Sequence, residues 1–214
     1  MSRSYLYAPG HDGARLETAF DHRADVVVFD LEDGVPAAQR DTARGLVVAA
    51  LRRRRAWVRI NPAETVDAGD DLDAVDGLAA GIRLPKTASA DDARWLVERA
   101  PGTPLICSIE SEQGLLAAPS IASVAGVATL SLGSKDLTAD LACEDSWDEL
   151  LFARRRLVLA CRAAGIQAPV DSVYYAAADR TSLREAAEAA CRLGFSGKST
   201  LWPEQVDVIN EVFQ

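Results

Sequence analysis

The 214-residue sequence has no long apolar segment, and no window approaches the roughly 18 apolar residues that span a bilayer. Its first residues carry no apolar signal core. Its four cysteines lack the paired spacing of a zinc site or a redox dithiol. Acids outnumber bases by 32 to 23, so the sequence lacks the basic excess that favours nucleic acids or anionic membranes. We therefore predict a cytoplasmic protein with neither nucleic-acid nor membrane partners.

Short apolar runs alternate with helical stretches along the whole chain. Several runs are continuous rather than alternating in hydrophobicity, which is typical of parallel strands buried on both faces. The predicted strands are 5–8, 25–30, 56–60, 81–85, 105–109, 127–132, 170–174 and 194–198. Eight strand–helix units predict an α/β fold, a (β/α)₈ TIM barrel formed by residues 1–214 as one domain. The longest predicted loop is 61–77.

In such a barrel, the residues that carry chemistry stand at the C-terminal ends of the strands. The charged candidates at those positions are, in strand order, Asp30, Glu32, Asp33, Arg59, Lys86, Glu110 and Asp136. Glu110 and Asp136 follow adjacent strands, so their carboxylates can converge on Mg²⁺, which binds few protein carboxylates and retains water. Arg59 has the donor geometry to hold a substrate carboxylate.

Each of these residues also has a purely structural interpretation. Asp30 and Asp33 could cap the helices that follow them, and Arg59 could form a structural ion pair. Lys86 could form an imine with a substrate or pair with the surrounding acids. Taken alone, the residues leave both the structural and the metal-dependent catalytic interpretation open.

Six segments resemble known motifs in the same order. Residues 3–10, RSYLYAPG, resemble RSxLFVPG, and residues 29–35, FDLEDGV, resemble LDLEDxV. The others are VRIN at 58–61, LPK at 84–86, IESEQG at 109–114 and GSKDLTAD at 133–140. These motifs are typical of the citrate lyase beta-subunit-like proteins of the HpcH/HpaI aldolase and malyl-CoA lyase family. The resemblance extends from Arg3 to Phe213.

The resemblance implies a (β/α)₈ barrel and a set of site residues. We predict metal binding by Glu110 and Asp136, substrate binding by Arg59 and Glu110, catalysis by Arg59, Glu32 and Asp33, and support from Asp30 and Lys86 without a Schiff base. The implied cofactor is Mg²⁺, acting as a Lewis acid on a 2-oxo acid. The implied reaction is reversible carbon–carbon cleavage of a citryl-CoA-like or malyl-CoA-like thioester to an oxaloacetate-like 2-oxo acid and acetyl-CoA. The family resemblance also implies a homo-oligomer, with a trimer favoured.

Three departures from the family pattern leave alternatives open. Asp12 stands where the first loop of the family usually carries a base, which favours an aldolase that acts on a free 2-oxo or hydroxy acid without coenzyme A. Trp202 replaces the histidine of the motif IHPxQ. The expected barrel is minimal, without the C-terminal lid extension of some relatives. The last two departures favour a non-catalytic, metabolite-binding subunit.

Overall fold

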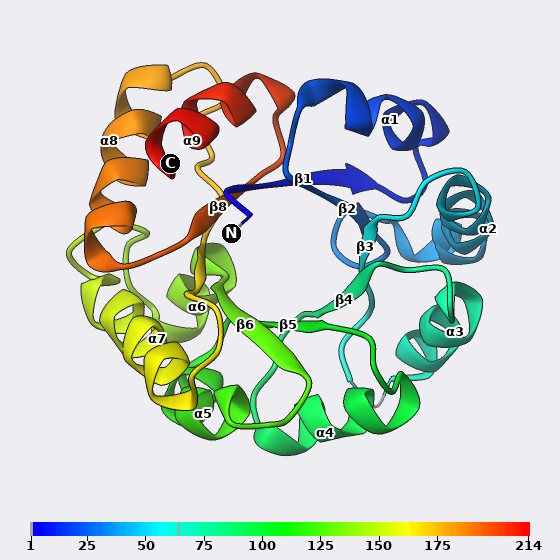
Figure 1. The fold of residues 1–214 in the computed structure, drawn as a ribbon, viewed down its shortest axis with the longest axis horizontal. Coiled ribbons are helices and arrows are strands. Elements are labelled where there is room, and N and C mark those ends of the chain that lie inside the picture. The colour runs from blue at the N-terminus through cyan, green and yellow to red at the C-terminus, as the bar shows by residue number, and fades with distance from the viewer. Residues whose placement is uncertain (1, 64) are drawn as a thin grey trace.

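The computed structural model describes residues 2–63 and 65–214, in which parallel strands close into a barrel surrounded by helices (Figure 1). Each strand pairs with its neighbours in the sequence, and β8 closes the barrel against β1. The strands are β1 (Ser4–Pro9), β2 (Val26–Asp30), β3 (Trp57–Arg59), β4 (Gly81–Leu84), β5 (Leu105–Ile109), β6 (Val127–Leu132), β7 (Val170–Asp171) and β8 (Gly197–Thr200). The predicted (β/α)₈ architecture is confirmed.

The helices form the outer layer of the molecule (Figure 1). They are α1 (Gly13–Thr18), α2 (Arg40–Leu51), α3 (Val66–Val75), α4 (Ala90–Arg99), α5 (Glu112–Ala122), α6 (Ser134–Leu141), α7 (Leu151–Ala164), α8 (Arg180–Leu193) and α9 (Val206–Val212). Short 3₁₀ helices are η1 (Ala19–His22), η2 (Ala37–Gln39) and η3 (Pro203–Gln205). No described helix combines the length and the apolar character required to cross a membrane.

The segment 61–77, predicted as a loop, contains helix α3. The Thr65 side chain accepts a hydrogen bond from the backbone N–H of Ala68 at 3.1 Å, which caps the first turn. Ala68, Leu72 and Val75 are buried along one face of the helix. Aspartates occupy most of the other positions, and they hide this apolar spacing in the sequence.

The last two strands also differ from their predicted bounds. β8 begins at Gly197 rather than at Gly194, because Gly194 ends α8 with a φ of 110°, a left-handed conformation that favours glycine. β7 ends at Asp171, and the chain then leaves the sheet, where Val173 and Tyr175 line the mouth of the barrel.

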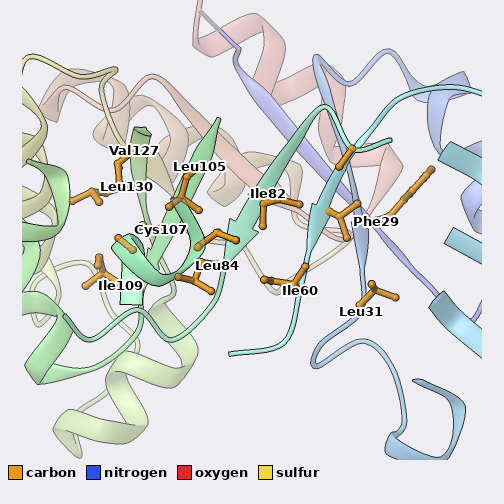
Figure 2. Packing of buried hydrophobic residues seen from close by; sticks show 14 of the residues in the cluster. Phe29, Leu31, Ile60, Ile82, Leu84, Leu105, Cys107, Ile109, Val127 and Leu130 are labelled. Carbon is orange, nitrogen blue, oxygen red and sulfur yellow. The ribbon is translucent and has the colours of Figure 1, made fainter. Parts of the chain in front are cut away.

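The largest hydrophobic core lies between the strands and the helices. Figure 2 shows side chains from the β2 to β6 region packing in this layer. In β5, Leu105, Cys107 and Ile109 belong to this core, whereas Ile106 faces the barrel interior. Because strand side chains alternate between faces, Glu110 continues the inward-facing set at the C-terminal end of β5.

The barrel interior tolerates no side chain at Gly81, beside Trp57 on the neighbouring strand β3. A Cβ atom at Gly81 would lie 2.7 Å from three ring atoms of Trp57. We expect Gly81→Ala to lower the free energy of unfolding by about 1–3 kcal/mol, measured by urea denaturation. Gly45→Ala in α2 is the control, because its Cβ would meet nothing within 4 Å. It should raise stability by up to about 1 kcal/mol. Equal effects of the two substitutions would contradict the packing argument.

Candidate active site

The ends of β2 and β3 carry a fixed carboxylate–guanidinium pair. Asp30 and Arg59 are partners in the strand register, and Arg59 Nε and Nη2 donate to the two Asp30 oxygens at 2.7 and 2.6 Å. The same oxygens accept the backbone N–H groups of Glu32 at 3.1 Å and Gly34 at 3.0 Å. Asp30 therefore holds the loop after β2 instead of capping a helix. The two-point contact also fixes the plane of the Arg59 guanidinium.

Glu32 links this pair to the loop after β4. Its carboxylate oxygens lie 2.9 Å from Arg59 Nη1 and 2.7 Å from Lys86 Nζ, and its side chain is only 3 % exposed. Burial raises the pKa of Glu32, although Arg59 and Lys86 oppose that shift. Asp33 is half-exposed and lies 3.3 Å from the Lys86 ammonium.

Lys86 is held in place as a cation. Burial lowers the pKa of its ammonium, but the contacts with Glu32 and Asp33 outweigh burial and raise the pKa above its ordinary value. A protonated amine cannot attack a carbonyl carbon, so this environment disfavours imine formation. The backbone of Lys86 adopts a φ of 49°, a left-handed conformation, and its N–H donates to Glu110 Oε2 at 3.2 Å.

The Glu110 side chain is buried and packs closely against the backbone of Gly133. A Cβ atom at Gly133 would lie 2.4 Å from Glu110 Cγ, so only glycine at this place lets the end of β6 approach. Burial raises the pKa of Glu110 to about 7, reinforced by Glu32 and Asp136 and opposed by Arg59 and Arg83. Burial therefore favours the neutral, protonated form of this side chain.

A cavity of about 280 Å³ opens at the C-terminal end of the barrel. Five of the predicted site residues line it, namely Asp30, Asp33, Arg59, Glu110 and Asp136. Glu32 and Lys86 instead line a neighbouring cavity of about 440 Å³, together with Asp33. Asp136 lies in the first turn of α6 and is half-buried. The structure therefore brings the predicted metal ligands and Arg59 to one cavity and places Glu32 and Lys86 beside it.

The sequence did not point to Arg83, a buried arginine on β4 that also lines the cavity. Arg83 donates to three serine hydroxyls, to Ser108 at 3.0 Å, to Ser131 at 2.6 Å and to Ser199 at 3.2 Å. Within residues 2–63 and 65–214, no carboxylate forms an ion pair with it. The one available signal is an arginine at an inward position of an otherwise apolar strand, GIRL.

The cavity also has an apolar side that sequence reasoning missed. Tyr7 from β1, Val173 and Tyr175 after β7 and Leu201 after β8 line it. The Tyr175 ring meets the Trp202 ring edge to face, with the centroids 6.2 Å apart. Trp202, the departure from the family motif, thus supports an aromatic wall of the barrel mouth.

Two carboxylates at the cavity could hold a Mg²⁺ ion. In the part of the chain that the structure describes, no three His, Cys, Asp or Glu side chains surround one point. Glu110 and Asp136 line the same cavity, and the cavity leaves space for water and ligand oxygens. Mg²⁺ is commonly held by one or two carboxylates with several waters, and it would stabilise the ionised form of the buried Glu110. The residues present fit such an ion.

The chain is similar to known proteins along nearly its whole length. The family model described as HpcH/HpaI aldolase/citrate lyase matches residues 3–203. The chain belongs to this family. Citrate lyase subunit beta of Escherichia coli (strain K12) is 36 % identical over 231 residues, which cover 99 % of this chain and 76 % of the relative. The motif-based family assignment is confirmed.

A second relative and a solved structure are also similar to the chain. A (3S)-malyl-CoA thioesterase of Cereibacter sphaeroides (strain ATCC 17025 / ATH 2.4.3) is 35 % identical, covering 99 % of this chain and 76 % of the relative. The structure of a citrate lyase beta subunit from M. tuberculosis, complexed with oxaloacetate and magnesium, matches with a TM-score of 0.89 and 30 % identity. That match covers 100 % of this chain and 97 % of the other. A solved structure of similar sequence and fold therefore holds oxaloacetate and magnesium.

Proposed function

We propose that the chain is a Mg²⁺-dependent carbon–carbon lyase. Its substrate would be a citryl-CoA-like or malyl-CoA-like hydroxyacyl thioester, cleaved to an oxaloacetate-like 2-oxo acid and acetyl-CoA or formed from them. One observation carries this proposal: Arg59, Glu110 and Asp136 line a single cavity at the catalytic end of a (β/α)₈ barrel. The names of the relatives, a citrate lyase subunit and a malyl-CoA thioesterase, support the same substrate class.

Glu110 and Asp136 would hold the metal, and Arg59 would hold the carboxylate of the 2-oxo acid. Bound magnesium polarises a carbonyl and stabilises the negative charge that develops as a carbon–carbon bond breaks. Three of the five N–H groups of Arg59 face Asp30 and Glu32. The remaining two are available to a ligand carboxylate, and the fixed guanidinium plane orients that ligand before reaction.

The acids around Arg59 would have different roles. Glu32 is buried between Arg59 and Lys86, so it acts by positioning the guanidinium. Asp33 lines the cavity with a half-exposed side chain, so it can reach a ligand. Lys86 stays an ammonium ion and keeps the two acids in place.

Calorimetric titration of the chain with oxaloacetate tests the site. We expect binding in the presence of Mg²⁺ and at least tenfold weaker binding after the metal is removed with a chelator. A cleavage assay with malyl-CoA, citramalyl-CoA and citryl-CoA then tests the reaction, with acetyl-CoA as the measured product. Metal-dependent oxaloacetate binding without turnover of any thioester would contradict the lyase and favour a metabolite-binding subunit.

An aldolase that acts on a free 2-oxo acid is the second candidate, because the first loop is acidic. Asp12 caps α1 by accepting the backbone N–H of Arg15 at 3.1 Å, so an acid occupies the entrance to that loop. Titration with acetyl-CoA separates the two candidates. Tight binding would reject the coenzyme A-free reaction, and oxaloacetate binding without acetyl-CoA binding would support it.

A further inference from the structure

Tyr7 is an aromatic residue of β1 that contacts two fixed cations. Its ring centroid lies 5.0 Å from Arg59 Cζ and 5.2 Å from Arg83 Cζ. Asp30 and Glu32 hold the first guanidinium, and serine hydroxyls hold the second. Cation–π contacts with two immobile groups give the ring a defined position.

The hydroxyl group of Tyr7 opens toward the cavity. The residue is 6 % exposed and lines the cavity, yet its hydroxyl forms no hydrogen bond with any residue in the described parts of the chain. The hydroxyl oxygen is not fully enclosed by protein atoms, so a group in the cavity can reach it. A buried tyrosine hydroxyl normally has a hydrogen-bond partner, so the Tyr7 hydroxyl is free to bond a group that enters the cavity.

We propose that Tyr7 binds ligand in the cavity, where its hydroxyl donates a hydrogen bond to an oxygen of an anionic 2-oxo acid. This inference rests on the proposed function, because it concerns the same ligand. Burial raises the pKa of Tyr7 to about 12 although both guanidinium groups oppose the shift, so the hydroxyl keeps its proton at physiological pH. Hydrogen bonds to a charged acceptor are stronger than neutral ones, and they favour an anion over a neutral ligand.

Tyr5 provides a matched control on the same strand. It also faces the barrel interior and is 4 % exposed, but it does not line the cavity. Tyr5→Phe therefore removes one phenolic oxygen from the barrel without changing the cavity.

The test is calorimetric titration of oxaloacetate, with Mg²⁺ present, into the natural chain, Tyr7→Phe and Tyr5→Phe. We expect the dissociation constant to rise roughly ten- to a hundredfold in Tyr7→Phe and to change less than twofold in Tyr5→Phe. The melting temperature of ligand-free Tyr7→Phe should be no lower than that of Tyr5→Phe. This result would show that Tyr7→Phe does not lose binding because it unfolds.

Each other outcome has a definite meaning. Unchanged binding by Tyr7→Phe, while the natural chain binds, overturns the role of Tyr7 and leaves the proposed function intact. An equal loss of affinity in both variants also overturns it. Tyr5 does not line the cavity, so the loss would then reflect a general change in the barrel interior and not a contact with ligand. Failure of the natural chain to bind oxaloacetate overturns the proposed function and this inference together.

Discussion

Glu110→Gln is expected to abolish Mg²⁺-dependent binding of oxaloacetate and to stabilise the ligand-free protein above pH 7. Glu110 is a buried carboxylate, 7 % exposed, in a cavity that it shares with Asp136. The amide keeps an oxygen that can accept the backbone N–H of Lys86, but it removes the negative charge that a divalent cation needs. Function and stability should therefore change in opposite directions.

The direction of the stability change follows from the pKa of Glu110, which burial raises from 4.5 to about 7. Between these values the folded protein holds a proton that the unfolded chain releases, so stability falls as the pH rises through this range. The stability associated with the neutral side chain is fully present below pH 4.5 and is lost as the pH rises through 7. At pH 8 the ionised carboxylate destabilises the ligand-free protein by about 3 kcal/mol, and glutamine removes this penalty.

Urea denaturation without metal, at pH 5 and at pH 8, measures this effect. The gain in Glu110→Gln should be present at pH 8 and small at pH 5. Glu112→Gln is the control, because Glu112 is exposed on α5 and does not line the cavity. Equal stability of Glu110→Gln and the natural chain at pH 8, together with retained metal-dependent binding, would contradict the placement of this carboxylate.

The barrel and the outline of the site could be predicted from sequence because both depend on local order along the chain. Each strand is followed by its own helix, and the C-terminal ends of parallel strands meet at one edge. Asp30 and Arg59 end β2 and β3, and Glu110 directly follows β5. These residues therefore had to approach one another once the barrel was inferred. The roles assigned to these residues remain predictions.

Features that depend on closure of the barrel could not be predicted in the same way. Arg83 is held by serines from β5, β6 and β8, and Ser199 lies 116 residues away in the sequence. A serine in a strand gives no sign that it will accept from a buried cation. The position of Tyr7 also depends on two arginines from other strands.

A buried ion cluster between β7, β8 and α7 was missed for a similar reason. Asp171 is buried and lies 2.6 Å from Lys198 Nζ and 3.2 Å from Arg154 Nε. The register pairs Asp171 with Lys198, and Arg154 also lies over the Trp147 ring at 4.5 Å from its centroid. Burial alone would raise the pKa of Asp171, but the two cations outweigh it and lower the pKa. The stability that this ionised carboxylate contributes is present above its ordinary pKa and is lost as the pH falls.

Asp171→Asn should lower the free energy of unfolding by about 3–5 kcal/mol at pH 7, because it leaves two buried cations without their common anion. Chemical denaturation measures this loss. Glu211→Gln is the control, since the ion pair of Glu211 with Arg184 lies at the surface. Removing an exposed pair is expected to change stability by at most about 1 kcal/mol.

A second substitution shows whether the unpaired cations cause the loss. Lys198→Met keeps an apolar stem of similar length and removes one cation, so adding it to Asp171→Asn should restore part of the lost stability. The double variant should then be more stable than the sum of the two single effects predicts, because the two residues are in direct contact. Strictly additive effects, or a change below about 1 kcal/mol for Asp171→Asn, would show that this cluster contributes little to the closure of the barrel between β7 and β8.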